Sequence, residues 1–98
     1  MSNREAIDNF SEFLFWDVDR YSVDIQKNEP FLVQRVLEYG LIEDWNALKR
    51  LYGVPRIART AQKLRSLDPR ALSFIAAISS TPIEQFRCYT TRPLMQIR

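Results

Sequence analysis

Apolar residues recur along much of this chain at the spacing of one helix face. Between residues 43 and 52 they stand at Trp45, Leu48, Leu51 and Tyr52, which a period of about 3.6 residues places on one side. Most other positions of the stretch are charged or polar. The pattern predicts an amphipathic helix at 43–52.

A second helix is predicted directly after the first. Gly53 stands where a helix end favours a positive φ, and Pro55 falls in the first turn of the next helix, where its missing N–H is not needed. The helix predicted at 54–65 has four apolar residues on one face: Ile57, Ala58, Ala61 and Leu64. Because so short a turn forces a steep crossing, the pair is typical of a helix-turn-helix.

Two further helices are bracketed by their own start and stop signals. Pro30 and Gly40 enclose a helix predicted at 29–39, and Asp68-Pro69 starts one at 69–79. The second of these is apolar on nearly every side. We therefore expect it to be the central and most buried helix.

The complete pattern predicts an all-α fold of five or six short helices, with the helix-turn-helix-like pair packed on the helix at 69–79. Short helices are expected after Ser11 and after Thr81, and Trp16 and Trp45 are expected to anchor the core. The chain is interpreted as one helical domain over 1–98, with a polar arm at 1–11, a folded core at 12–89 and a basic tail at 90–98.

Composition is that of a soluble globular domain. The 98 residues include 46 % hydrophobic and 12 % aromatic side chains, enough for a core. No apolar run approaches the roughly 20 residues of a membrane span. A single cysteine, Cys88, allows no internal disulfide and is expected to be a small buried hydrophobe. These features favour the cytoplasm and no contact with a membrane.

The absence of histidine excludes several classes of site. No imidazole base, Cys–His pair or common zinc ligand set can be built without it. Asp17, Asp19 and Asp24 lack the spacing and the glycine of a calcium loop, so we expect Asp17 to cap backbone N–H groups or to pair with an arginine. The sequence predicts no catalytic residue, metal or cofactor, and a protein that is not an enzyme.

Charge is divided unevenly between the two halves. Residues 1–48 hold 4 basic and 10 acidic side chains, and residues 49–98 hold 10 basic and 2 acidic ones. The net charges of these two halves are −6 and +8. Either the halves neutralise each other inside the fold, or the basic half presents a surface to an anion.

The basic residues gather around the helix predicted at 54–65. Arg56, Arg59 and Lys63 fall nearly opposite its apolar stripe, where they form either a solvated face or a phosphate-binding face. Val54-Pro55 stands where DNA-binding helix-turn-helices have a polar cap, which argues against base-specific reading. The candidate residues for binding nucleic acid or an acidic partner are Lys49, Arg50, Arg56, Arg59, Lys63, Arg65 and Arg70.

Five short motifs carry a resemblance to a known family. They are Phe15-Trp16-Asp17-Val18-Asp19, Arg35-Val36-Leu37-Glu38-Tyr39-Gly40, Asp44-Trp45, Tyr52-Gly53 and Phe86-Arg87-Cys88-Tyr89. In order and spacing they resemble a Bacteroidota-type family of small uncharacterised bacterial proteins, a domain of unknown function. Some members are neighbours of abortive-infection nucleotidyltransferase toxins. The resemblance implies an antitoxin or its regulator.

The sequence is consistent with two functions. The first is a regulator that binds double-stranded DNA, within a toxin–antitoxin system or outside one. The second is a protein-interaction module without nucleic-acid binding, which neutralises a cognate toxin or associates with itself as a homodimer.

Overall fold

Helices make up the regular structure of residues 2–90, the part of the chain that the computed structural model describes, with Thr90 described by its backbone alone. No strand occurs within these residues, so the predicted all-α fold is confirmed. The predicted basic tail lies outside the described residues from 91 onwards. The α-helices are α1 (Asn3–Asp8), α2 (Glu29–Tyr39), α3 (Ile42–Tyr52), α4 (Val54–Lys63), α5 (Pro69–Ser79) and α6 (Arg87–Thr90); short 3₁₀ helices are η1 (Glu12–Phe15), η2 (Arg20–Ser22) and η3 (Ile83–Gln85).

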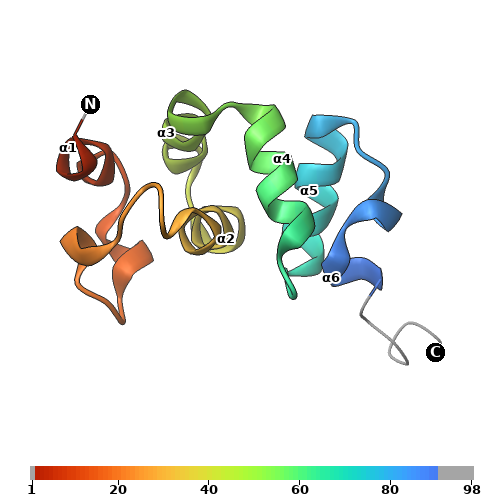
Figure 1. Ribbon diagram of the computed structural model, residues 1–98, viewed down its shortest axis with the longest axis horizontal. Coiled ribbons are helices and arrows are strands. Elements are labelled where there is room, and N and C mark those ends of the chain that lie inside the picture. Colours follow the sequence, from red (N-terminus) through yellow and green to blue (C-terminus); the bar gives the residue numbers. More distant parts are fainter. Residues whose placement is uncertain (1, 91–98) are drawn as a thin grey trace.

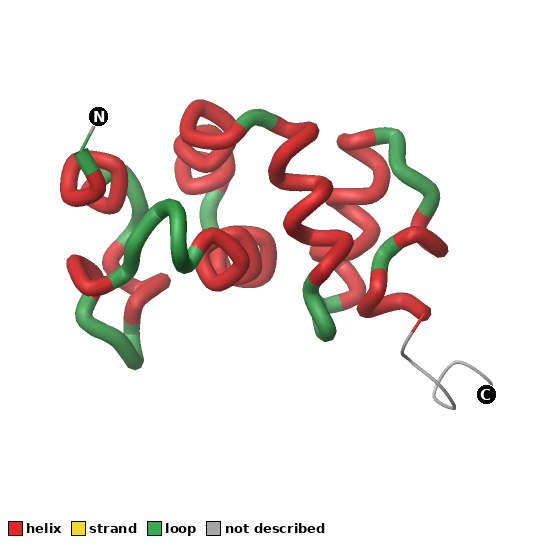
Figure 2. The backbone as a smooth tube through the Cα atoms, viewed as in Figure 1, coloured by secondary structure: helices red, strands yellow, loops and turns green. Residues whose placement is uncertain are grey.

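The longer helices form two crossed pairs. Figure 1 shows α2 and α3 nearly end-on, whereas α4 and α5 run from top to bottom beside them. In Figure 2 the loops that connect these four helices are short, and the N-terminal segment and α6 occupy opposite ends of the molecule. α2 contacts α3, α4, α5 and η1, and α4 contacts α2, α3, α5 and α6, so these two helices form the centre of the fold.

The prediction that α5 would be central and most buried is wrong. Its buried residues are Ala71, Leu72 and Ile75, all on one side of the helix. Phe74 and Ile78 stay 41 % and 44 % exposed, although the Phe74 ring contacts Trp45 of α3. Apolar residues all around a helix predicted burial all around it, but the fold leaves these two side chains partly uncovered.

The prediction of a loose polar arm at 1–11 is also wrong. The segment contains α1, which opens with a capping box: the Ser2 hydroxyl accepts from the Glu5 amide, and the Glu5 carboxylate accepts from the Ser2 amide. Ile7 and Phe10 are buried in the core, with 0 % and 4 % exposure. Two apolar residues were too few for a periodic signal, yet both are buried in the core and help to hold the segment on the fold.

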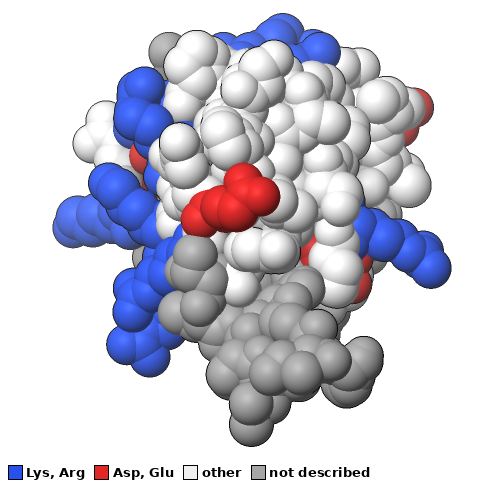
Figure 3. Space-filling model, turned by 90° about the vertical axis from the view of Figure 1, so that its right-hand side faces the viewer, with Lys and Arg blue, Asp and Glu red and all other residues white. Residues whose placement is uncertain are grey.

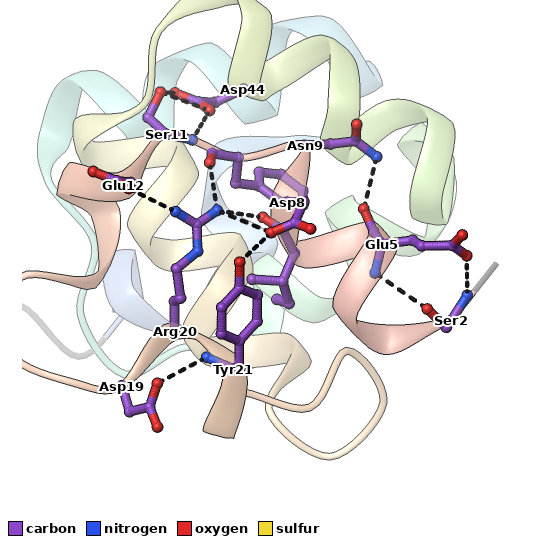
Figure 4. A network of polar contacts seen from close by, with 12 residues as sticks. Ser2, Glu5, Asp8, Asn9, Ser11, Glu12, Asp19, Arg20, Tyr21 and Asp44 are labelled. Carbon is purple, nitrogen blue, oxygen red and sulfur yellow. Dashed lines mark hydrogen bonds and ion pairs between the residues drawn. The ribbon is translucent and has the colours of Figure 1, made fainter.

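An arginine from η2 ties this N-terminal segment together. The Arg20 guanidinium donates to the carbonyls of Ile7 and Phe10 at 3.1 and 3.2 Å. It also lies 3.8 Å from Asp8 and 3.6 Å from Glu12, as Figure 4 shows. One side chain therefore joins α1, the following turn and η1.

A buried carboxylate joins the N-terminal segment to α3. Asp44 is 1 % exposed and accepts from the Ser11 amide and hydroxyl, each at 2.8 Å (Figure 4). It also accepts from the Leu41 amide at 2.9 Å. Ser11 was expected to cap the short helix after it, but its side chain makes no capping bond there. The Ser11 hydroxyl donates to Asp44 instead. The three bonds to Asp44 compensate the cost of burying a polar side chain.

The two tryptophans have different environments. Trp45 is 6 % exposed and belongs to the core as predicted, whereas Trp16 is 59 % exposed and the prediction of a second core anchor is wrong. In the run from Phe13 to Trp16 it is Leu14 and Phe15 that are buried. Cys88 is 2 % exposed, which confirms its predicted burial.

Candidate nucleic-acid interface

The turn between α3 and α4 consists of one residue. The Gly53 amide donates to the Lys49 carbonyl at 2.8 Å and ends α3, while the Gly53 carbonyl accepts from the Ile57 amide at 3.0 Å and begins α4. Its φ of 85° and ψ of 148° lie in a region that is essentially reserved for glycine. The turn is thus shorter than the three or four residues of a DNA-binding helix-turn-helix.

The apolar side of α4 is buried in the core. Ile57 and Ala61 are fully buried, Ala58 is 6 % exposed, and α4 packs against α2, α3, α5 and α6. The helix ends at Lys63 rather than at the predicted residue 65, because Leu64 turns into an extended conformation and buries its side chain.

On the other side of α4, Arg56 is held by a carboxylate of α2. Its Nη2 lies 2.8 Å from Glu29 Oε1, and its Nε lies 3.2 Å from both carboxylate oxygens. The Thr60 hydroxyl donates to the same carboxylate at 2.6 Å. Since the Glu29 side chain is 10 % exposed and the Arg56 side chain 48 %, the pair lies at the edge of the core.

The ionisation of this cluster follows from its contacts. Burial by itself would raise the pKa of Glu29, but the hydrogen bonds from Arg56 and Thr60 outweigh it and hold the pKa below its ordinary value. The bond to Glu29 raises the pKa of Arg56. Burial, together with the Glu29 charge, raises the pKa of Tyr52 to about 12, and the Tyr52 hydroxyl donates to the carbonyl of Ile25. The cluster is therefore an ionised structural contact between α2 and α4.

Arg59 and Lys63 are the cations of α4 whose side chains bind no other described residue. Both side chains are exposed, and neither forms a hydrogen bond or ion pair with another residue of the described range 2–90. Lys63 still contributes to the lowered pKa of Glu29 through its charge. Figure 3, which looks at the α4–α5–α6 end of the molecule, shows most of the visible Lys and Arg side chains at its left edge and others at the top and right, around a mostly uncharged surface.

Residues 10–61 match a family described as a family of unknown function, DUF6922, over just over half of the chain. The chain belongs to this family. No curated protein and no solved structure matches it.

The DUF6922 match includes the structural core of the candidate interface. It begins at Phe10 and runs through α2, α3 and most of α4, so Glu29, Arg56 and Arg59 lie inside it. Lys63 and all of α5 and α6 lie beyond it. An uncharacterised domain family was expected from the motifs, and the match supports that part of the resemblance.

The other candidate cations of this DUF6922 protein belong to parts of the chain other than α4. The Lys49 ammonium lies 5.7 Å from the Trp45 ring centre. Arg50 lines a cavity of about 260 Å³ between α1 and α3, and Arg70 lines another of about 460 Å³ between α2 and α5. Arg65 is exposed and follows α4 in the chain. On α4 itself the candidate cations are Arg56, Arg59 and Lys63.

Glu29 is the residue that the sequence interpretation missed. It was placed at the start of a helix with no partner, 27 residues before Arg56. The charge asymmetry between the halves suggested pairing but not which groups pair. Arg56–Glu29 joins the two halves, whereas Arg20 and Arg35 form ion pairs within the acidic half.

The three spaced aspartates have separate structural roles. Asp17 pairs with Arg35 at 3.0 Å, which is the predicted kind of contact and lowers the pKa of Asp17. Asp19 accepts from the Tyr21 amide as a cap of η2. Asp24 accepts from the amides of the next turn. Across residues 2–90, no three acidic or cysteine side chains come together as a metal site, and no helix there has the length and apolarity to span a bilayer.

Proposed function

We propose that this DUF6922 protein is a non-catalytic cytoplasmic module that binds double-stranded DNA through phosphate contacts on the outer face of α4. The observation that supports it is the uncommitted basic flank of this helix. Arg59 and Lys63 are exposed opposite a buried stripe, and Arg56 keeps part of its guanidinium at the surface. A helix anchored on one side and basic on the other can lie along a phosphate backbone.

Binding of this kind is expected to be independent of base sequence. The first turn of a recognition helix is the part that reaches base edges. In α4 that turn contains Val54 and Pro55, which carry no side-chain donor, and Arg56, whose Nε and Nη2 are occupied by Glu29. Phosphate contacts position a protein but carry no direct sequence information.

A duplex fits this face better than a single strand. Proteins that bind single strands stack bases on exposed aromatic rings between their cations. No residue of α4 is aromatic. Tyr52, the aromatic residue next to Arg56, is half-buried and uses its hydroxyl within the fold.

The proposal is tested by titrating a fluorescent duplex with the full chain at several salt concentrations. Each phosphate contact contributes about −0.9 to the slope of log K against log salt. With Arg59, Lys63 and a partly engaged Arg56, we expect a slope of about −2 to −3 and low-salt affinity on the order of 10⁻⁵ M. The double variant Arg59→Ala/Lys63→Ala is expected to lose about 2 units of that slope.

A matched control separates local contacts from net charge. Arg4→Ala/Lys27→Ala removes the same two charges from exposed positions in the acidic half. This control should bind DNA like the wild type. Equal loss in both double variants, or no binding at low salt, would reject the α4 interface.

A second candidate function is neutralisation of a cognate bacterial toxin. The observation that favours it is the charge division, since the basic half offers counter-charge to an acidic protein surface. Co-expression with the product of a neighbouring toxin gene tests it. Co-purification and relief of toxicity, both lost in Arg59→Ala/Lys63→Ala, are the results expected from this function.

A further inference from the structure

A second surface, away from the outer face of α4, is built from uncovered apolar side chains. It lies where α2 ends, α3 begins and α5 passes. Its members share exposure between 41 % and 63 %, far above that of core residues. This apolar face consists of Trp16, Tyr39, Leu41, Ile42 and Phe74.

The apolar face is continuous. The rings of Trp16 and Tyr39 meet edge to face with their centroids 5.2 Å apart. Tyr39 and Phe74 line one cavity of about 460 Å³, and Phe74 lines a second one of about 210 Å³ together with Leu41 and Ile42. The face is therefore a single surface with two hollows that meet at Phe74.

Neighbouring side chains hold the exposed rings of Trp16 and Phe74 in place. The Arg35 guanidinium lies 4.0 Å from the Trp16 ring centre and is fixed by Asp17 at 3.0 Å. Phe74 packs edge to face on the buried Trp45, with 5.1 Å between centroids. Side chains ordered before binding lose little conformational freedom when a partner arrives, which favours association.

We infer that the apolar face binds the same face of a second copy of this chain, forming a two-fold symmetric dimer. Taking about 200 Å² for a fully exposed large side chain, the five residues offer roughly 500 Å² of surface. Patches of that size mark interaction sites, and a standard interface needs about 800 Å² per partner, including a polar rim. The apolar face can supply the centre of such an interface.

The charges beside the apolar face suit self-association. Glu43 follows Ile42 at the start of α3, and Arg70 lines the larger hollow next to Phe74. Neither Glu43 nor Arg70 has an ion-pair partner within the described residues. In a two-fold symmetric dimer, a contact between Glu43 of one copy and Arg70 of the other is made twice, because an isologous interface repeats every pair.

Sedimentation velocity of the full chain at concentrations from about 1 to about 200 µM tests this inference, since dimerisation follows mass action. We expect a monomer–dimer equilibrium that Ile42→Asp weakens at least about tenfold. Ile42 is exposed, and an acidic residue in the first turn of a helix is favourable, so the variant should fold. Val18→Asp is the control, because Val18 is exposed but lines a different cavity, and it should leave the dimer unchanged.

Charge reversal tests the predicted pairing. Glu43→Arg and Arg70→Glu should each weaken the dimer, and the double variant should restore it. A chain that is monomeric throughout the range, or a dimer that is insensitive to Ile42→Asp, would overturn the inference. Since the duplex titration does not require a dimer, a monomeric chain that still binds DNA rejects this inference and leaves the proposed function standing.

Discussion

Two buried carboxylates, Glu29 and Asp44, hold distant parts of this chain together. Asp44 is satisfied by amide and hydroxyl donors, whereas Glu29 is satisfied by a guanidinium and a hydroxyl. Buried charges persist only where partners replace the lost water. Each carboxylate therefore selects one packing of its helix against a neighbouring segment.

The Glu29 contact predicts a pH dependence of stability. Its folded-state pKa lies below the ordinary 4.5, so as pH falls the unfolded chain takes up the proton first and the folded state loses its advantage. We expect Glu29→Gln to lower the free energy of unfolding at neutral pH by about 1–3 kcal/mol. Urea unfolding between about pH 7 and about pH 3 should show a flatter pH dependence in Glu29→Gln than in the wild type.

The control for this measurement is Glu84→Gln, which removes an exposed carboxylate from η3. Its stability curve should run close to that of the wild type. If Glu29→Gln and the wild type gave parallel curves below the ordinary pKa, the ion pair with Arg56 would contribute nothing to acid stability.

At the scale of elements, the helix ends were the most predictable feature. The bounds predicted for α2 and α5 agree with the structure, and Asp68 caps α5 by accepting from the Arg70 amide. Such signals depend on neighbouring residues only: proline lacks an N–H and aspartate bonds the backbone nearby. The end of α4 was misplaced because it depends on where Leu64 finds the core.

The two glycines end their helices for different physical reasons. Gly40 has a φ of −72°, which any residue adopts, but a Cβ there would stand 2.7 Å from the Val36 carbonyl oxygen. At Gly53 a Cβ would meet nothing closer than Pro55 Cδ at 4.0 Å, yet its φ of 85° disfavours other residues. Packing requires the first glycine and backbone conformation requires the second.

Replacing the turn glycine should therefore cost stability without a steric clash. We expect Gly53→Ala to lower the free energy of unfolding by roughly 1–3 kcal/mol, the cost of a residue held in a sparsely populated backbone region. Urea unfolding should show a lower midpoint with an unchanged slope, because the core is not altered. An unchanged midpoint would mean that α3 and α4 can be joined through another turn conformation.

At the scale of the whole molecule, the two proposed surfaces use different helices. The basic flank belongs to α4, whereas the apolar face belongs to the α2–α3 junction and α5 (Figure 1). Substitutions more than about 7–10 Å apart that share no partners generally act independently. A dimer formed through the apolar face would carry two basic flanks.

This separation predicts that the two activities can be removed one at a time. Ile42→Asp should abolish self-association while each chain keeps its salt-dependent DNA binding. Arg59→Ala/Lys63→Ala should lose DNA binding and keep the wild-type dimerisation constant. Duplex titration and sedimentation velocity on both variants check this, and loss of both activities in either variant would indicate one shared surface.

The sequence by itself determined the helical class, the helix bounds of α2 and α5, the buried stripe of α4 and the burial of Trp45. These features follow from periodicity and from local backbone chemistry, which act over a few residues. The packing of α1 on the fold was not predicted, since it depends on the burial of Ile7 and on Arg20, which donates to the carbonyls of Ile7 and Phe10 from a distant part of the chain.

Only the tertiary structure decided which side chains find a partner and which stay exposed. In it Arg56 pairs with Glu29, Arg59 and Lys63 pair with no other described residue, and Trp16 and Phe74 are exposed. Periodicity shows that a side chain belongs to a helix face but not which element covers that face. Exposure and ion pairing depend on contacts between residues far apart in the chain, and these exist only once the helices have packed.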